Sequence, residues 1–473
     1  MSRVIVQWWG LIPFALMLLS IAVFPLVPAA AHIWENPRNQ LVLSLLLGMP
    51  VAVWFILAGS GMQVLATGIE YIQFIMLLLA LFVVSGGIYL RGDLAARPAT
   101  NTAFLAVGGL LASFIGTTGA AMLLIRPILN TNRERRFRAH TVVFTILVVA
   151  NCGGVLTPLG DPPLFLGFLR GVPFTWTFHL IVEWLFVNAM LLGTYFLLDR
   201  RLHHRESAAD LARDETEKTP LRIDGAVNFA WFALVIAAVA VAPSVDIHAI
   251  EVGHTEPLQW LPLRELIFAV AALASLRTTS RETRYEQNSF SWSPIAEVAA
   301  LFIGIFLTMM PALRYLEAVA PKLPLNEVTF FVFSGGLSSV LDNAPTYATF
   351  FSMAAQLPGD LRIAGVPEPY LVAISLGSVF CGAITYIGNG PNFMVKSVAE
   401  SRQVCMPSFG GYMVWTMRYL VPVLAAMVMI FVVGGPLWST AGVAIAALSI
   451  GMTAAGVGTP VLDGDKADSH AEN

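Results

Sequence analysis

The sequence predicts an all-α membrane protein with about 11 transmembrane helices and two re-entrant hairpins. Two inverted-topology repeats, each with a broken helix at the midplane, are expected to form it. Of the 473 residues, 57% are hydrophobic and only 12% are charged, whereas a soluble protein carries about 25% charged residues. The charges cluster between long apolar runs, and one segment of the first half recurs in the second half.

The apolar runs have the length that a helix needs to cross a bilayer, which is about 20 residues. The candidate spans are residues 4–29, 39–58, 69–90, 141–169, 175–198, 225–243, 262–277, 295–318, 369–398, 410–433 and 438–457. The first run is longer than the apolar part of a signal peptide, so we expect an uncleaved first helix. The last run lies in 434–473, which we expect to be an extra C-terminal helix and tail.

Two further apolar stretches, 101–130 and 325–357, are rich in Gly, Thr, Ser, Asn and Pro near their midpoints. We expect each to form two short helices joined by a tight turn, entering and leaving on the same side of the membrane. Such backbone is tolerated at membrane depth only where protein or a water-filled cavity surrounds it. Both turns are therefore candidate parts of a binding site.

The distribution of Lys and Arg predicts the orientation. If 101–130 is re-entrant, most Lys and Arg of the connecting segments fall on one side, which the positive-inside rule identifies as cytoplasmic. The densest clusters are 133–138 and 199–224, and we interpret 199–224 as a flexible cytoplasmic linker. The prediction is an N-terminus outside and a C-terminus inside. Because no organellar targeting segment is recognisable, we expect the cytoplasmic (inner) membrane of a bacterium.

An internal repeat supports the two-half organisation. Residues 154–165 (GVLTPLGDPPLF) and 382–393 (GAITYIGNGPNF) agree at Gly, Thr, Gly, Pro and Phe, and each follows one hairpin by a similar interval. The predicted repeats are 1–198, with a broken helix at 141–169, and 225–433, with a broken helix at 369–398. Opposite orientation of the two halves is the plan of secondary transporters.

A helix cannot continue regularly through the repeated segment of the first half. Pro158, Pro162 and Pro163 lack a backbone N–H, and Gly160 loosens the backbone. The freed carbonyl groups suit a dehydrated cation, and the half-helix N-termini suit an anion. The alternative is a purely structural kink, which the two matching positions beside hairpins disfavour.

Two carboxylates fall at these interruptions, Asp161 in the first broken helix and Asp342 in the second hairpin. A carboxylate at membrane depth is costly and marks a functional site, so we predict that both bind Na⁺. The alternative for Asp342 is a helix cap. The oxygens that would complete the ion or substrate site belong to Thr117, Thr118, Asn151, Thr157, Asn343, Thr346, Thr385 and Asn389.

Other features carry weaker predictions. Arg126 and Arg170 are expected to reach the two membrane surfaces by snorkelling, and Glu70 is expected near an interface. The three cysteines form no CxxC pair, so we expect neither a disulfide nor a cofactor. There is no basic patch with interleaved aromatic residues, which argues against nucleic-acid binding.

At its motifs the chain resembles the ion transporter superfamily, which includes NhaD-type sodium/proton antiporters, arsenite pumps, the melanosomal P protein, citrate transporters and divalent-anion/sodium symporters. The resemblance spans about residues 40–430 and is carried by Asn151–Gly154, Thr157–Pro163, Leu341–Thr346 and Gly388–Asn392. It implies an alternating-access carrier and a homodimer. In the anion-transporting branch, Ser-Asn-Thr hairpin tips hold Na⁺ and a substrate carboxylate. This chain departs from that pattern at both tips, although it is similar overall to a citrate-transport branch.

Two functions follow from these observations. The first is a sodium/proton antiporter in which Asp161 and Asp342 alternately bind Na⁺ and H⁺. The second is a citrate or dicarboxylate transporter coupled to Na⁺ or H⁺, which must hold an anion beside two aspartates. The partners expected are a small ion or small organic anion and the lipid bilayer. A membrane enzyme is disfavoured because no nucleophile–base set is recognisable, and a passive channel because inverted halves with broken helices are typical of carriers.

Overall fold

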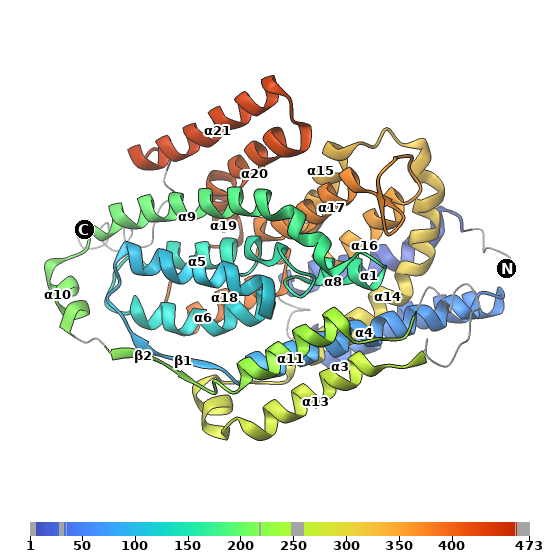
Figure 1. The fold of residues 1–473 in the computed structure, drawn as a ribbon, viewed down its shortest axis with the longest axis horizontal. Helices are drawn as coiled ribbons and strands as arrows, with labels where there is room; N and C mark the ends of the chain where they lie inside the picture. Colours follow the sequence, from blue (N-terminus) through green and yellow to red (C-terminus); the bar gives the residue numbers. More distant parts are fainter. Residues whose placement is uncertain are drawn as a thin grey trace.

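The computed structural model describes residues 6–27, 33–34, 36–216, 219–246, 260–458 and 460. Within these ranges the protein is mainly helical, with two small two-stranded sheets. Figure 1 shows most of the long helices running side by side along the molecule. The all-α prediction is therefore confirmed.

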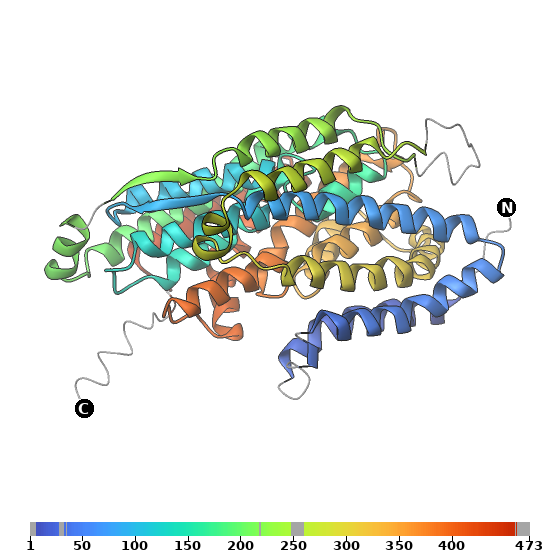
Figure 2. The same cartoon turned by 90° about the horizontal axis from the view of Figure 1, so that it is seen from below.

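One group of helices packs around α14, and Figure 2 shows these helices from a second side. In this group α14 contacts α1, α3 and α4, α13 contacts α4 and α11, and α11 contacts α4. The group consists of α1 (Ile12–Val23), α3 (Pro37–Leu57), α4 (Gly61–Ser85), α11 (Asn228–Val241), α13 (Leu263–Thr278) and α14 (Ser293–Val319). Short helical turns at Trp8–Leu11, Phe24–Leu26, Glu282–Gln287 and Ala320–Lys322 flank them.

The second group holds the two repeated segments. Here α5 packs on α6 and α9, α18 packs on α6, and α16 packs on α8, α15 and α17. Its first-half members are α5 (Pro98–Ile115), α6 (Thr117–Thr131), α7 (Ala139–Phe144), α8 (Pro162–Leu169) and α9 (Ile181–His203). Its second-half members are α15 (Glu327–Ser338), α16 (Asn343–Ala354), α17 (Glu368–Cys381), α18 (Gly390–Ser401), α19 (Phe409–Tyr419), α20 (Val421–Met427) and α21 (Pro436–Ala455).

Among the described residues, seven helices are long and apolar enough to cross a membrane. They are Pro37–Leu57, Gly61–Ser85, Pro98–Ile115, Phe174–His203, Ser293–Lys322, Phe409–Val433 and Pro436–Ala455. Large apolar side chains on their outer faces are exposed, such as Leu57 at 82% and Leu437 at 75%, as expected where lipid replaces water. The protein is therefore a multi-pass membrane protein.

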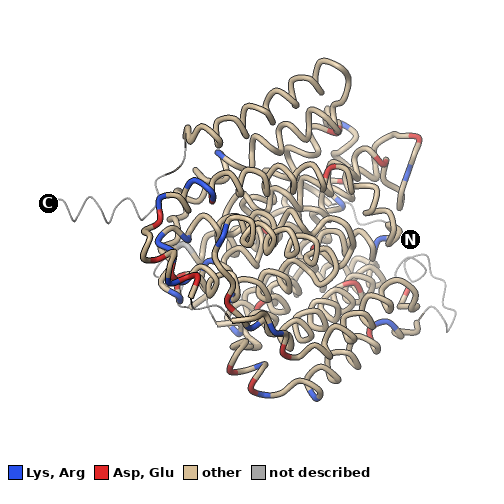
Figure 3. Tube along the Cα trace, turned by 60° about the vertical axis from the view of Figure 1, so that its left-hand side comes forward, with Lys and Arg blue, Asp and Glu red and all other residues tan. Residues whose placement is uncertain are grey.

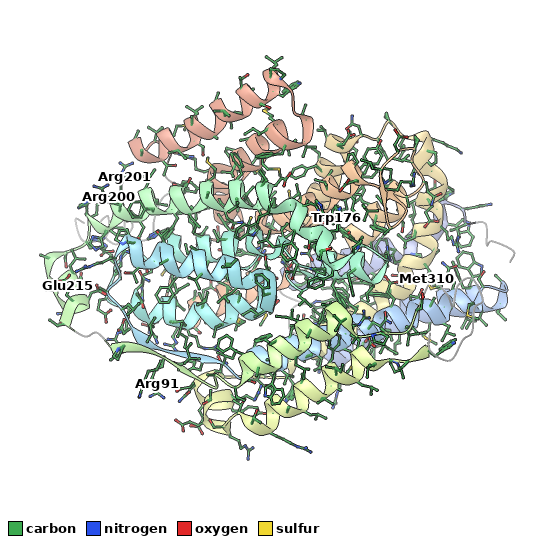
Figure 4. The ribbon with its side chains drawn as sticks, viewed as in Figure 1. Arg91, Trp176, Arg200, Arg201, Glu215 and Met310 are labelled. Carbon is green, nitrogen blue, oxygen red and sulfur yellow. The ribbon has the colours of Figure 1, made fainter. Side chains whose placement is uncertain are left out.

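Charged residues are unevenly placed along the molecule. Figure 3 shows a concentration of charged positions at the left-hand edge and long uncharged helical stretches elsewhere. In Figure 4 the labelled charged residues all lie in the left half, whereas the buried Trp176 and Met310 lie in the right half. One end of the helical bundle thus carries most of the charge.

The helix predicted at 69–90 begins earlier, because α4 starts at Gly61. The added residues, 61–68, include Gln63 and two glycines, which lower the local hydropathy. Gln63 Oε1 accepts a hydrogen bond from Arg314 Nη2 at 3.1 Å. A partner distant in sequence therefore supports the helix in a segment that is less apolar than the predicted span.

The segment predicted as a flexible linker, 199–224, is ordered where the structure describes it. It contains α10 (Ala208–Thr216) and β2 (Thr219–Asp224), and β2 pairs antiparallel with β1 (Tyr89–Asp93). Arg135 contacts Asp199 Oδ1 at 2.6 Å and Glu206 Oε1 at 3.3 Å, with all three side chains buried. Burial lowers the pKa of Arg135, but these carboxylates outweigh burial and hold it above its usual value. Charge pairs, rather than apolar periodicity, thus order the described part of this segment, and its role as a cytoplasmic linker between two halves stays a prediction.

Candidate functional site

The two repeated segments break their helices in the same way. In the first half, the π-helical segment Thr145–Val149 and the 3-10 turn Cys152–Val155 are followed by an extended Asp161, after which α8 begins. In the second half, α17 and the turn Gly382–Ile384 are followed by an extended Asn389, after which α18 begins. The φ and ψ angles are −144° and 143° at Asp161 and −151° and 139° at Asn389. Asp161 and Asn389 therefore occupy equivalent positions.

Each break is tied to the turn of the helix pair that precedes it. Thr157 Oγ1 donates to the backbone oxygen of Ser113, and Thr385 Oγ1 donates to that of Ser339. Glycine lets the chain fold this tightly, since a side chain at Gly160 would overlap the backbone oxygen of Gly154. Two of the predicted threonine ligands, Thr157 and Thr385, thus hold the backbone of the breaks in place.

The helix pairs predicted at 101–130 and 325–357 are present as α5–α6 and α15–α16. The first turn is Gly116, whose φ of 82° suits glycine. The second turn ends at Asp342, whose Oδ1 accepts a hydrogen bond from the Ala344 backbone N–H at 3.1 Å. Both turns deliver a helix N-terminus to the breaks, at Thr117 and at Asn343.

Asp161 is the centre of the site. Its side chain is 1% exposed, and its carboxylate accepts three hydrogen bonds from neutral donors. Thr117 Oγ1 donates at 2.8 Å and Asn389 Nδ2 at 3.2 Å, both to Oδ1, and Asn343 Nδ2 donates to Oδ2 at 2.5 Å. Among the described residues, no Lys, Arg or His forms an ion pair with Asp161. Three predicted site residues from both halves therefore meet on the predicted carboxylate.

A free acceptor lies beside this carboxylate. Asn343 is fully buried, and its Oδ1 has no hydrogen-bond partner among the residues that the structure describes. A buried polar atom without a partner is unfavourable by about 1–3 kcal/mol. An oxygen of this kind next to a carboxylate is suited to bind a cation or a proton donor.

Three asparagines extend the network behind Asp161. Asn151 Nδ2 donates to Asn392 Oδ1 at 2.7 Å, and Asn389 Nδ2 lies 3.2 Å from Asn151 Oδ1. Asn392 Nδ2 donates to the backbone oxygens of Gly382 and Thr385, at 2.8 and 2.9 Å. Asn392 was not among the predicted site residues, and the equivalent position of the first repeat is the apolar Leu164. Its place inside the repeated motif was the available signal.

The other predicted ligands lie at the edge of the site. Among the described residues, the Asp342 carboxylate caps α16 and forms no hydrogen bond with another site side chain, although it interacts electrostatically with Asp161. Thr346 Oγ1 donates to the Asp342 backbone oxygen at 3.0 Å, and Thr118 lines the cavities next to Asp161. The capping alternative for Asp342 is confirmed, and its Na⁺ ligation stays a prediction.

Four helix N-termini converge on Asp161, because α6, α8, α16 and α18 all begin at or next to a residue of this network. Helix N-termini carry partial positive charge, which stabilises an ionised carboxylate or a bound anion. A cavity of about 110 Å³ reaches Asp161, well below the roughly 300–1,000 Å³ of sites for organic ligands. The Asp161 cavity thus has the size for an ion rather than for citrate.

Arg170 and Arg126 do not simply snorkel. Arg170 Nε contacts Glu70 Oε1 at 3.0 Å, joining α8 to α4, and also donates to the Ala348 backbone oxygen. Arg126 is 9% exposed and donates to Asn288 Oδ1 at 3.1 Å. Residues distant in sequence hold both guanidinium groups inside the protein, which a reading of each helix alone could not reveal.

A family model described as "Putative citrate transport" matches residues 3–432 of the chain. A protein called "46 kDa membrane protein", from Mycobacterium leprae, is 24% identical over 306 residues, which cover 63% of this chain and 68% of that protein. Residues 3–432, which the family model matches, contain both breaks and both helix pairs.

Proposed function

This chain belongs to the putative citrate transport family, and on that premise we propose that it is a secondary active transporter that works by alternating access. Two inverted repeats would form it, with α5–α6 and α15–α16 as re-entrant hairpins. The proposed setting is a bacterial inner membrane, with the N-terminus outside, the C-terminus inside and two copies per assembly.

Sodium/proton antiport is the activity that the Asp161 geometry supports best. The observation that carries it is a buried carboxylate with only neutral donors around it and the free Asn343 Oδ1 beside it. A buried charge requires a partner or neutralisation. Either Na⁺ or H⁺ provides this, and the two compete for the same oxygens. Asp161 therefore binds one of them in each half of the cycle.

The Na⁺-bound form would use an oxygen of Asp161 and Asn343 Oδ1, with Thr117 and Asn389 fixing the carboxylate. Protonation of Asp161 releases Na⁺, and loss of the proton on the other side of the membrane allows Na⁺ to bind again. The four helix N-termini keep the carboxylate stable between these events. Movement of the group containing α8 and α18 past α4 and α14 would change which side reaches the site.

The test uses purified protein in liposomes that contain a pH-sensitive dye and carry an imposed proton gradient. Addition of Na⁺ or Li⁺ should change the internal pH, and Asp161→Asn should abolish the change. Asp360→Asn removes an exposed carboxylate and serves as the matched control, which should exchange like the native protein. Equal exchange by Asp161→Asn and the native protein would refute the proposal.

Citrate or dicarboxylate transport is the second candidate, and two observations favour it. The family description refers to citrate, and a cavity of about 460 Å³ adjoins the Asp161 cavity. In this case Asp161 would bind the coupling cation while the anion occupies the larger space. Uptake of labelled citrate that requires Na⁺ or a proton gradient, without exchange in the absence of citrate, would select this candidate.

A further inference from the structure

We propose that Arg126 and Asn288 form a binding site for a small organic anion in the larger cavity, separate from the cation site at Asp161. The inference rests on the second candidate function, citrate or dicarboxylate transport, and deepens it by naming the residues that bind the anion.

Arg126 is a buried cation without a carboxylate partner among the described residues. Its Nη1 donates to Asn288 Oδ1 at 3.1 Å, and a guanidinium offers five N–H donors in all. Asn288 is itself fixed, since its Nδ2 donates to the backbone oxygens of Gly86 and Ile88 at 2.9 and 2.8 Å. The amide therefore orients the guanidinium without neutralising its charge. A charge held this way in a largely buried place favours an anionic ligand.

The walls of the cavity are neutral or positive. No Asp or Glu is among the residues that line it. Hydroxyl groups come from Ser85, Ser289, Ser291, Ser293 and Ser397. Arg402 interacts electrostatically with Arg126 and adds positive charge nearby. Such surroundings repel Na⁺ and attract an anion.

The size and geometry indicate an organic carboxylate. The volume of about 460 Å³ lies within the range of sites for small organic ligands. The planar fork of Arg matches a carboxylate with two parallel hydrogen bonds. Serine hydroxyls can donate to further carboxylate oxygens. The ligand class is therefore a small anion with one or more carboxylates.

The cavity lies between the two groups of helices. Arg126 is on α6 and Ser397 on α18, whereas Ser85 is on α4 and Ser293 on α14. Phe82, Thr118, Pro294 and Met394 line both this cavity and the one at Asp161. An anion at Arg126 would thus lie next to the cation site and contact both groups of helices.

The experiment measures binding of radiolabelled citrate and succinate to the purified full-length protein. We expect Arg126→Gln to weaken binding of at least one of them by about tenfold or more, since a charge-assisted hydrogen bond is lost. Arg126→Lys should weaken it less, because the charge remains without the fork. Arg38→Gln, at an exposed position, is the matched control and should bind like the native protein.

A second variant keeps the test valid if Arg126→Gln does not fold. Ser397→Asp places a negative charge at an exposed position on the cavity wall, and it should weaken carboxylate binding as well. The proposal is overturned if the native protein binds neither citrate nor succinate, or if Arg126→Gln or Ser397→Asp leaves binding unchanged. Displacement by inorganic phosphate at citrate-like concentrations would overturn the carboxylate assignment. Asp161→Asn in the exchange assay decides the antiport proposal independently.

Discussion

Replacement of Asp161 by asparagine should separate stability from transport. In the native protein Oδ1 accepts from Thr117 and Asn389, and Oδ2 accepts from Asn343. An asparagine with its oxygen at the Oδ1 position keeps the first two bonds and directs its own Nδ2 at Asn343. Because Asn343 Oδ1 has no partner, rotation of the Asn343 amide by half a turn restores a hydrogen bond there.

The expected magnitudes follow from this count. Asp161→Asn keeps three hydrogen bonds and removes a buried charge, so its stability should differ from the native value by about 1 kcal/mol or less. Asp161→Ala leaves three donors without an acceptor, and at about 1–3 kcal/mol each it should lose at least about 3 kcal/mol. Both variants should lose Na⁺-dependent proton exchange, because neither carries a carboxylate.

Thermal unfolding of the detergent-purified variants checks this ranking. We expect the midpoint of Asp161→Asn to lie near the native one and that of Asp161→Ala to lie clearly below it. Adding Asn343→Ala to Asp161→Asn removes the amide that rotates, so the double variant should be less stable than Asp161→Asn alone. If Asp161→Asn is as unstable as Asp161→Ala, the reasoning about the Asn343 amide is wrong.

Three further predictions concern the fold around the site and the contacts of the segment 199–224. Gly160→Ala should lower the unfolding midpoint and the transport rate, because the new side chain overlaps the backbone oxygen of Gly154. Gly193→Ala is the matched control, since Gly193 has open space around it, and it should not lower the midpoint. Thr385→Val should destabilise the protein by about 1–2 kcal/mol, because the hydrogen bond to the Ser339 backbone oxygen is lost. Thr385→Ser keeps the hydroxyl and should restore most of the lost stability in the same unfolding assay. Equal unfolding midpoints for the two variants would contradict a structural role for the Thr385 hydroxyl. Arg135→Gln should destabilise the protein by about 3–5 kcal/mol, because Asp199 is left buried without its guanidinium partner. If the variant and the native protein give the same size-exclusion profile after mild heating, the predicted loss of stability is wrong.

Four of the residues selected from the sequence meet in the structure, because membrane insertion restricts where polar residues occur. Asp161 stood out as a carboxylate in a break, and Thr117, Asn343 and Asn389 stood out as polar residues in turns and breaks. The structure shows that these four meet. Their distances could not be predicted, because the contacts join positions up to 228 residues apart.

The features that the sequence did not predict share one physical reason. The order of 199–224, the place of Asn392 and the contact between Arg126 and Asn288 all depend on polar partners distant in the chain. Periodicity and hydropathy report how a helix meets lipid or core. They do not report which buried polar group pairs with which, and that pairing determines the chemistry of the site.

The most direct test of the account is equilibrium binding of ²²Na⁺ to the purified protein, at alkaline pH and after acidification. We expect the native protein and Asp360→Asn to bind ²²Na⁺ and to release it on acidification, and we expect Asp161→Asn to bind none. Binding by Asp161→Asn equal to that of the native protein would contradict the claim that Asp161 carries the cation.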